Sequence, residues 1–413
     1  MSRIWVNGKE VEASEDRKLM DVLRNDCHLK SIKDGCSQGA CGSCTVVIDG
    51  NAIKACVQTM KRMEGKHILT VEGLTDYEKE VFVYSFGEAG AVQCGFCIPG
   101  MVMCAKALLD KTLTPSREEI AFAIRNNICR CTGYKKIVAA IELAASIFRG
   151  EVQIPAKESG VSVGRKYHRI DAREKVLGTG QYIDDVEIEG MTYAGAIRSA
   201  YPRARVLKVN KDAALALDGV IAVLTAEDIP GNRQVGHIKH DWDVMIPTGE
   251  ITHFLGDVIC LVVAETEEIL EQAKKLVEID YEELPAITNV ADALAEGAPL
   301  LHEDGNIVSH QHLVRGDVDS AIKEAAYVVT EHFETPWTEH AYMEPECCIA
   351  MPHEDGVFMY SSDQGVYSIR EECALMLGLP EEKVIVENKL VGGGFGGRED
   401  AVIQPLASLA AYR

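Results

Sequence analysis

The sequence lacks three features that would point to particular protein classes. It has no apolar run that approaches the roughly 18–20 residues needed to span a membrane. Its first residues, Met1-Ser2-Arg3-Ile4-Trp5, lack the apolar core of a secretory signal peptide. It is also poor in positive charge, with 42 Lys and Arg against 64 Asp and Glu and a net charge of −22. We therefore expect a cytoplasmic protein that binds neither membranes nor nucleic acid.

The charges and the cysteines are distributed unevenly. Residues 1–150 contain 20 basic and 18 acidic residues, whereas residues 151–413 contain 22 and 46. Ten of the 14 cysteines lie in the first 150 residues. Such a density in a cytoplasmic chain indicates metal or redox centres rather than disulfides. A length of 413 residues suggests two to four domains, at roughly 100–200 residues each.

Four cysteines have the spacing C-x4-C-x2-C-x11-C: Cys36, Cys41, Cys44 and Cys56. The first three have the spacing of a plant-type [2Fe–2S] ligand set, and the glycines between them let the backbone curl around a cluster. Asp49-Gly50 predicts a hairpin that places Cys56 beside Cys44 across the ladder. A second hairpin at Asn7-Gly8 and a helix near 17–25 would complete a small β-grasp domain of the ferredoxin type.

Four other cysteines have the spacing C-x2-C-x31-C-x-C: Cys94, Cys97, Cys129 and Cys131. Apolar residues at helical spacing and two capping boxes, which begin at Thr75 and Ser116, predict a bundle of four helices. The expected helices lie near 77–88, 98–110, 117–127 and 134–148. Both cysteine pairs fall at helix junctions, where they can converge. Either group of four could instead be a structural zinc site, although two adjacent groups favour an electron relay.

Three motifs here closely resemble the iron–sulfur half of the molybdenum hydroxylases, the xanthine dehydrogenase and aldehyde oxidoreductase family. They are Gly35–Cys44, Gln93-Cys94-Gly95-Phe96-Cys97-Ile98-Pro99-Gly100-Met101 and Cys129-Arg130-Cys131-Thr132-Gly133-Tyr134. The resemblance implies two [2Fe–2S] clusters, of which the second lies beside a pterin-bound molybdenum. It also implies that Gln93 contacts the pterin and that Cys131 is the cluster ligand nearest to it.

The resemblance implies a multidomain α+β architecture. We expect a ferredoxin-like β-grasp [2Fe–2S] domain over 1–76, a four-helix [2Fe–2S] domain over 77–150, a linker over 151–165, an α/β hammerhead domain over 166–295 and the N-terminal portion of a molybdopterin-binding domain over 296–413. The hammerhead assignment depends on residues 167–171 with Lys175, Gly178 and Tyr182. Within that domain, residues 258–264 are typical of a buried strand, and 267–278 of a helix capped by Thr266.

A glycine-rich segment, residues 391–400, resembles the molybdenum-pocket loop of the same family. Glycine lets a backbone press against a ligand without Cβ collisions, although such loops are often ordinary turns. The family usually has Thr at the position of Asp363, next to Gln364, and residues 339–346 resemble a segment that we expect to be mainly structural. The resemblance implies that Gly393, Gly394, Phe395 and Gly396 contact the cofactor, that Gln364 hydrogen-bonds an oxygen ligand of molybdenum and that Glu399 contacts a purine ring.

The function that the resemblance implies is hydroxylation of a purine such as xanthine, with water as the oxygen source. The molybdopterin is expected as a dinucleotide, and electrons would leave molybdenum through both clusters. Because the linker has no room for a flavin domain, we expect FAD on a separate subunit or a soluble electron carrier. A homodimeric assembly is a further expectation.

The residues leave three points open. The general base of the family lies far beyond the glycine-rich loop and is not in this chain, so we expect a truncated or split chain that needs the remaining C-terminal segment of the molybdenum domain. An aldehyde is the alternative substrate within the family. A non-catalytic electron-transfer module with two clusters and, more remotely, a zinc-stabilised interaction protein are alternatives from other classes.

Overall fold

The computed structural model describes residues 1–156, 163–164, 167–302 and 304–413. It divides into two compact units, which are described separately. The first contains Met1–Glu189, Ala341–Arg370 and Val384–Gln404, and the second contains Gly190–His340, Glu371–Lys383 and Pro405–Arg413. Residues 157–162 and 165 of the expected linker lie outside the described residues. In the described ranges, no helix combines the length and the apolar character that a membrane crossing requires.

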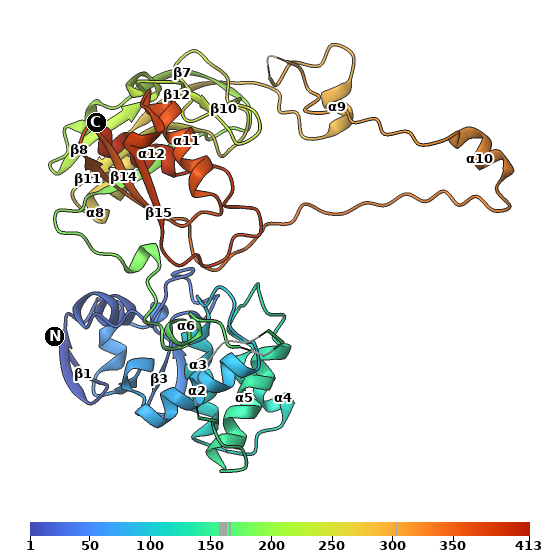
Figure 1. The fold of residues 1–413 in the computed structure, drawn as a ribbon. Helices are drawn as coiled ribbons and strands as arrows, with labels where there is room; N and C mark the ends of the chain where they lie inside the picture. Colours follow the sequence, from blue (N-terminus) through green and yellow to red (C-terminus); the bar gives the residue numbers. More distant parts are fainter. Residues whose placement is uncertain (157–162, 165–166, 303) are drawn as a thin grey trace. The chain divides into compact units, whose positions relative to one another are not determined.

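The first unit begins with a five-stranded sheet whose strand order is β2-β1-β5-β3-β4. Figure 1 labels two of its strands, β1 and β3. Its elements are β1 (Ser2–Val6), β2 (Lys9–Ala13), α1 (Leu19–Asp21), β3 (Thr45–Ile48), β4 (Asn51–Lys54) and β5 (His67–Leu69). Both hairpin turns, Asn7-Gly8 and Asp49-Gly50, have positive φ at their two central residues, as a type I′ turn requires. Ile48 pairs with Asn51, so the predicted hairpin register is confirmed.

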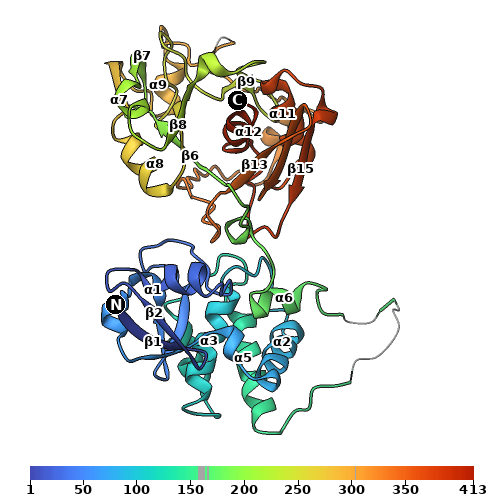
Figure 2. The same ribbon diagram turned by 90° about the vertical axis from the view of Figure 1, so that its left-hand side faces the viewer.

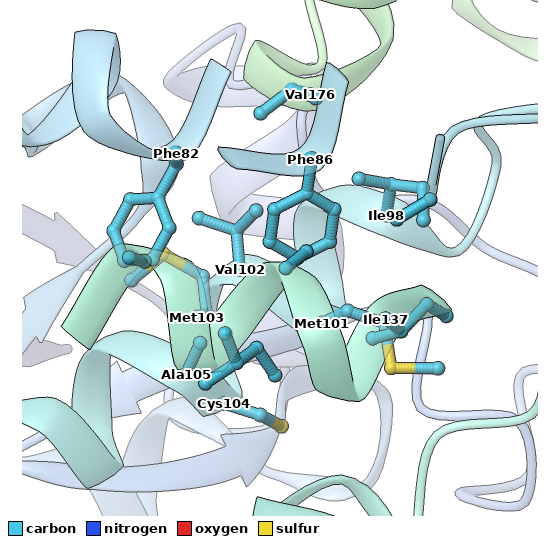
Figure 3. Packing of buried hydrophobic residues seen from close by; sticks show 14 of the residues in the cluster. Phe82, Phe86, Ile98, Met101, Val102, Met103, Cys104, Ala105, Ile137 and Val176 are labelled. Atoms are coloured by element: carbon cyan, nitrogen blue, oxygen red, sulfur yellow. The ribbon is translucent and has the colours of Figure 1, made fainter. Parts of the chain in front are cut away.

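Four helices follow in the first unit, as the sequence predicts. They are α2 (Asp76–Glu88), α3 (Ile98–Leu109), α4 (Arg117–Ile124) and α5 (Lys135–Phe148). The predicted capping boxes at Thr75 and Ser116 are both formed, so the first N–H groups of α2 and α4 have partners. Figure 3 shows Phe86 of α2, Met101 of α3 and Ile137 of α5 in the core that these helices share.

A short helix, α6 (Ala172–Leu177), packs against α2 and α3 (Figure 2). Val176 is fully buried in the core of the four helices, and Gly178 ends the helix with φ +69. After it, the carboxylate of Asp185 binds Lys33 Nζ and lies 3.2 Å from Arg24 Nη1. The segment from α6 to Asp185 therefore contacts both the four-helix part and the ferredoxin-like part of the first unit.

The second unit contains a three-stranded antiparallel sheet with strand order β6-β11-β8. Its elements are β6 (Tyr193–Arg198), β7 (Ala204–Asn210), α7 (Asp212–Leu215), β8 (Val220–Thr225), β9 (Gln234–Val235), β10 (Trp242–Asp243), β11 (Val258–Ala264), α8 (Glu267–Lys274), β12 (Glu278–Glu283), α9 (Val290–Leu294) and α10 (Val318–Glu324). β11 is buried along its whole length, as predicted. Thr266 caps α8 as expected, but the helix ends at Lys274 rather than near 278, because the chain from Glu278 pairs with β7.

A second sheet in the first unit has the order β13-β14-β15, with β14 and β15 parallel. The last elements of the chain are β13 (Cys348–His353), β14 (Gly356–Ser361), α11 (Val366–Leu377), β15 (Val384–Asn388) and α12 (Gln404–Tyr412). β15 runs from Val384 to Asn388. It leads directly into the glycine-rich segment.

Candidate functional site

The four thiols of the first group form two close pairs beside the ferredoxin-like sheet. Cys36 and Cys41 lie in the loop before β3, where the Cys41 N–H donates to Cys36 Sγ at 3.4 Å. Cys44 and Cys56 contact one another at the β3–β4 hairpin, as the register predicts. Cys36 is half-buried, whereas the other three are buried. The first pair is therefore nearer to solvent than the second.

The loop that carries this group is fastened on two sides. Lys54 Nζ donates to the carbonyl oxygens of Gly39 at 2.6 Å and Ala40 at 3.0 Å. Gly42 has φ +77, and a Cβ there would lie 2.5 Å from the carbonyl oxygen of Asn126. The backbone approaches the helical part so closely that only glycine fits at position 42.

The second group forms at the two predicted helix junctions. Cys97 directly precedes α3, and Cys129 and Cys131 lie between α4 and α5. Cys94 contacts Cys131 and Cys97 contacts Cys129, with a further contact between Cys129 and Cys131. The hydroxyl of Tyr134, the residue before α5, accepts a hydrogen bond from the Cys129 N–H at 3.0 Å. The four thiols therefore lie next to one another in the order Cys94, Cys131, Cys129 and Cys97.

The pKa values of neighbouring thiols are shifted in opposite directions. Burial raises the pKa of the Cys44 thiol to about 12, whereas hydrogen bonds from Cys131 and Cys97 lower the pKa of Cys129 to about 2. Sulfurs this close cannot all be thiolates unless a cation lies among them, and metal ligation requires thiolates. The residues present therefore fit a metal cluster in each group.

The spacing of the first group favours a two-iron cluster over a single zinc ion. In a [2Fe–2S] cluster, each iron takes two of the four thiolates, and in the first group these would be Cys36 with Cys41 and Cys44 with Cys56.

The two groups are joined by a direct main-chain contact. Ile128, which precedes Cys129, donates its N–H to the Cys41 carbonyl oxygen at 2.7 Å. Beside it, Asn127 Nδ2 donates to the Gly42 carbonyl oxygen at 2.9 Å. A single hydrogen bond therefore links a residue of one cysteine group to the neighbour of a residue in the other.

The glycine-rich segment forms a loop that is held by Gln364. The Gln364 N–H donates to the Arg398 carbonyl oxygen at 2.9 Å, and its Oε1 accepts from the Gly396 N–H at 2.9 Å. A Cβ on Gly394 would lie 2.2 Å from that Oε1, so a larger residue there would have to displace the Gln364 side chain. Phe395 has φ +57 and is 49% exposed. The structure thus brings four of the predicted cofactor-contacting residues together.

A buried ion pair, which the sequence analysis did not assign, holds the base of this loop. Glu344 Oε2 lies 2.7 Å from Arg398 Nη1, and both side chains are 1% exposed. The same carboxylate accepts from the Gly392 N–H at 2.7 Å, and Arg398 donates to the Ser362 carbonyl oxygen at 2.9 Å. Burial raises the pKa of the Glu344 carboxyl, and Arg398 opposes that rise. The only sequence signal was the family-like segment 339–346.

Two predicted contact residues lie exposed at the surface of the first unit. Gln93 lies beside the second cysteine group, where its Nε2 donates to the Cys131 carbonyl oxygen at 3.2 Å. Glu399 lies at the end of the glycine-rich loop, where its N–H donates to the Gly396 carbonyl oxygen at 3.3 Å. Gly393 adopts φ +100 in the same loop. Contacts of these residues with a cofactor or substrate stay predictions.

Four sequence families match successive parts of the chain. They are the 2Fe-2S iron-sulfur cluster binding domain over residues 4–69, the [2Fe-2S] binding domain over 70–142, the aldehyde oxidase and xanthine dehydrogenase a/b hammerhead domain over 177–285 and the molybdopterin cofactor-binding domain over 301–413. The predicted fold class is confirmed, whereas the domain boundaries given above stay predictions.

Known proteins match more than half of the chain or nearly all of it. Aldehyde oxidoreductase of Megalodesulfovibrio gigas is 35% identical over 99% of the chain and 48% of that protein. A probable xanthine dehydrogenase subunit of Bacillus subtilis is 38% identical over 59% of the chain and 33% of that protein. The solved aldehyde oxidoreductase of Desulfovibrio gigas superposes with a TM-score of 0.91 at 31% identity, over 99% of the chain and 48% of its own. The chain therefore spans half or less of the length of these relatives.

Proposed function

We propose that this chain, which belongs to the aldehyde oxidoreductase and xanthine dehydrogenase family of molybdenum hydroxylases, forms the electron-transfer and cofactor-contacting part of such an enzyme. The observation that supports this most is the arrangement of the eight cysteines. They form two groups of four neighbouring thiols, joined through the main chain of Cys41 and Ile128. This arrangement suits the passage of single electrons between two clusters.

Each group of thiols would hold one [2Fe–2S] cluster in this proposal. The outer ligands are Cys36, Cys41, Cys44 and Cys56, and the inner ligands are Cys94, Cys97, Cys129 and Cys131. Gln93, Gln364 and the loop 393–396 would contact a molybdopterin cofactor, proposed as a dinucleotide. When bound, that cofactor supplies the hydroxylation of an electron-poor carbon with water as the oxygen source. The Glu344–Arg398 pair and Gln364 keep the loop backbone in one conformation, and no residue of this chain is assigned as the general base.

A purine such as xanthine is the first substrate candidate. The support is Glu399, which lies exposed at the end of the glycine-rich loop and matches the residue that contacts a purine in the family. An aldehyde is the second candidate, which the similarity to aldehyde oxidoreductase over 99% of the chain favours. The Glu399 carboxylate distinguishes the two substrate candidates, because a carboxylate can accept hydrogen bonds from purine N–H groups, which a simple aldehyde lacks.

The substrate test uses this chain co-expressed with a polypeptide equivalent to the remaining half of its relatives. The complex is assayed against xanthine and benzaldehyde. Glu399→Gln should lower kcat/KM for xanthine about ten- to a hundredfold, because it removes a charged hydrogen-bond acceptor worth about 1.5–3 kcal/mol. The same substitution should have little effect on kcat/KM for benzaldehyde. Turnover of benzaldehyde alone would refute the purine proposal and leave the aldehyde proposal standing.

The cluster test uses the chain by itself. We expect about four iron and four sulfide per chain, a brown colour and two distinct paramagnetic signals after reduction. The same iron and sulfide with no molybdenum beside any partner chain would favour the non-catalytic electron-transfer module. A colourless chain with stoichiometric zinc would refute the cluster assignment. FAD on a partner subunit, or a soluble carrier, is proposed as the acceptor beyond the outer cluster.

A further inference from the structure

A lysine outside both cysteine motifs lies against the inner thiols. Lys175, in α6, is 5% exposed, and its Nζ donates to the Gln93 carbonyl oxygen at 3.0 Å. The hydroxyl of Tyr182 donates to the next carbonyl oxygen, that of Cys94, at 2.7 Å. A Cβ on Gly95 would lie 2.5 Å from Lys175 Cγ and 2.7 Å from the Tyr182 hydroxyl oxygen. The ligand loop is therefore pressed directly onto these two side chains.

A small network of charges holds Lys175 in this position. Asp171 Oδ2 lies 2.8 Å from Lys175 Nζ, and Arg169 binds both oxygens of the same carboxylate at 2.7 Å. The hydrogen bond from Arg169 and then the one from Lys175 hold the pKa of Asp171 well below its usual range. Asp171 is therefore ionised near neutral pH, and together with the basic side chains of Arg169 and Lys175 the network has a formal excess of positive charge beside the loop.

The outer thiols have a counterpart to this lysine. Lys54 Nζ donates to the carbonyl oxygens of Gly39 and Ala40, which lie between Cys36 and Cys41. Each ligand loop is thus bound by one lysine through its main-chain carbonyls. The two differ in burial, since Lys175 is buried and Lys54 only half-buried.

We propose that Lys175 is a positioning residue that raises the reduction potential of the inner cluster, as Lys54 raises that of the outer cluster. The inference rests on the proposed function, in which the inner thiols hold a [2Fe–2S] cluster. Reduction by one electron adds one negative charge to the cluster, and a cation fixed nearby stabilises the reduced form. Because solvent screens a buried charge less, the effect of Lys175 should exceed that of Lys54.

The experiment is a redox titration of the full chain with both clusters, followed by electron paramagnetic resonance. Lys175→Met should lower the midpoint of one signal by about 59 mV or more, which is a tenfold change in the equilibrium constant of a one-electron couple. Asp171→Asn keeps the lysine but removes its counter-charge, so it should move the same signal upward. Lys54→Met should lower the other signal only, by a smaller amount.

The opposite signs separate electrostatic tuning from damage to the loop. A structural role alone would make Lys175→Met and Asp171→Asn broaden the signal or shift it in the same direction, which would overturn the inference. If Lys175→Met fails to retain its inner cluster, the upward shift in Asp171→Asn still decides the question. A wild-type chain without iron refutes the proposed function and this inference together. Two intact signals whose midpoint potentials are unchanged in both variants would refute this inference but leave the proposed function standing.

Discussion

Gly95 illustrates at the scale of one residue how tightly the inner ligand loop is packed. It has φ +93, and a Cβ would meet Lys175 and Tyr182 at less than 3 Å. Gly95→Ala should therefore abolish the inner paramagnetic signal and leave the outer one, with about half of the iron lost. Gly133→Ala is the matched control, because Gly133 also lies in the inner motif with positive φ but has nothing within 4 Å of its Cβ position. An equal loss of the inner signal in both variants would show that backbone strain, rather than a collision of the added Cβ, causes the loss.

His253 is a residue whose protonation the fold controls. Its Nδ1 lies 3.6 Å from Oδ2 of the buried Asp257, and this interaction raises the pKa of His253 above 6.5. The folded state thus favours the protonated imidazole. The stabilisation is fully present below about pH 6.5 and is lost as the pH rises through the raised pKa.

The prediction is that Asp257→Asn lowers the pKa of His253 toward 6.5. The measurement is a titration of the His253 ring protons by nuclear magnetic resonance. His302→Gln is the control, because the His302 ring stacks on His253 at 5.3 Å without supplying a negative charge. An unchanged His253 pKa in Asp257→Asn would contradict the assignment of Asp257 as its cause.

At the scale of elements, the Glu344–Arg398 pair fastens the glycine-rich loop to the segment before β13. Arg398→Met leaves the Glu344 carboxylate buried without its cation, which costs about 3–5 kcal/mol. We expect hydrogen exchange of the backbone amides at 391–400 to accelerate accordingly, since local opening becomes easier. Exchange is the suitable measurement because a chain of several domains does not unfold in one step.

The control for this prediction is the double variant Glu344→Gln with Arg398→Met. It removes both charges and leaves a neutral amide that can still accept from the Gly392 N–H. Protection of the loop should be partly recovered relative to Arg398→Met alone. If the double variant is as unprotected as the single one, the cost lies in lost packing of the arginine rather than in an unpaired charge.

Local signals in the sequence predicted the elements around the cysteines, because their determinants are neighbours in the chain. Asp49-Gly50 set the register that brings Cys44 to Cys56, and capping boxes marked the starts of α2 and α4. The end of α8 was missed, since it depends on the pairing of the following strand with β7. The glycine-rich motif and the cysteine spacing likewise indicated the candidate sites.

Contacts between distant residues could not be predicted in this way. Lys175 and Gln93 are 82 positions apart, and Arg398 and Glu344 are 54 apart. Neither pair has a spacing that a helix or a hairpin would impose. Both pairs depend on how separate elements pack, and both contribute the charges that surround the candidate sites. The sequence therefore indicates the proposed ligands more directly than the residues that would tune them.

At the scale of the whole molecule, residues 307–340 form an arm in which every side chain is exposed. Figure 1 shows this part of the second unit as a long excursion that carries α10. Large apolar side chains lie along its last part, where Tyr327, Val329, Phe333 and Trp337 are between 80% and 104% exposed. So much exposed apolar surface indicates a binding partner.

We expect the arm to be covered by a polypeptide equivalent to the remaining half of the relatives. The aldehyde oxidoreductase structure that matches 99% of this chain contains about as much polypeptide again, and the arm lies within the molybdopterin cofactor-binding match at 301–413. Pairing with a strand of that polypeptide would satisfy both the backbone and the apolar face of residues 327–337. A second copy of this chain is the competing occupant.

The prediction is that co-expression with that polypeptide slows hydrogen exchange at 327–337 at least tenfold and yields a complex with one copy of each chain. Phe333→Ser with Trp337→Ser should abolish complex formation, because it removes the largest apolar contacts of the arm. Ile238→Ser is the control, since Ile238 is 92% exposed but lies outside the arm. An arm that exchanges equally fast with the polypeptide present, or that becomes protected only as the chain dimerises with itself, would contradict this assignment, since burial against the proposed partner must protect the amides that it pairs.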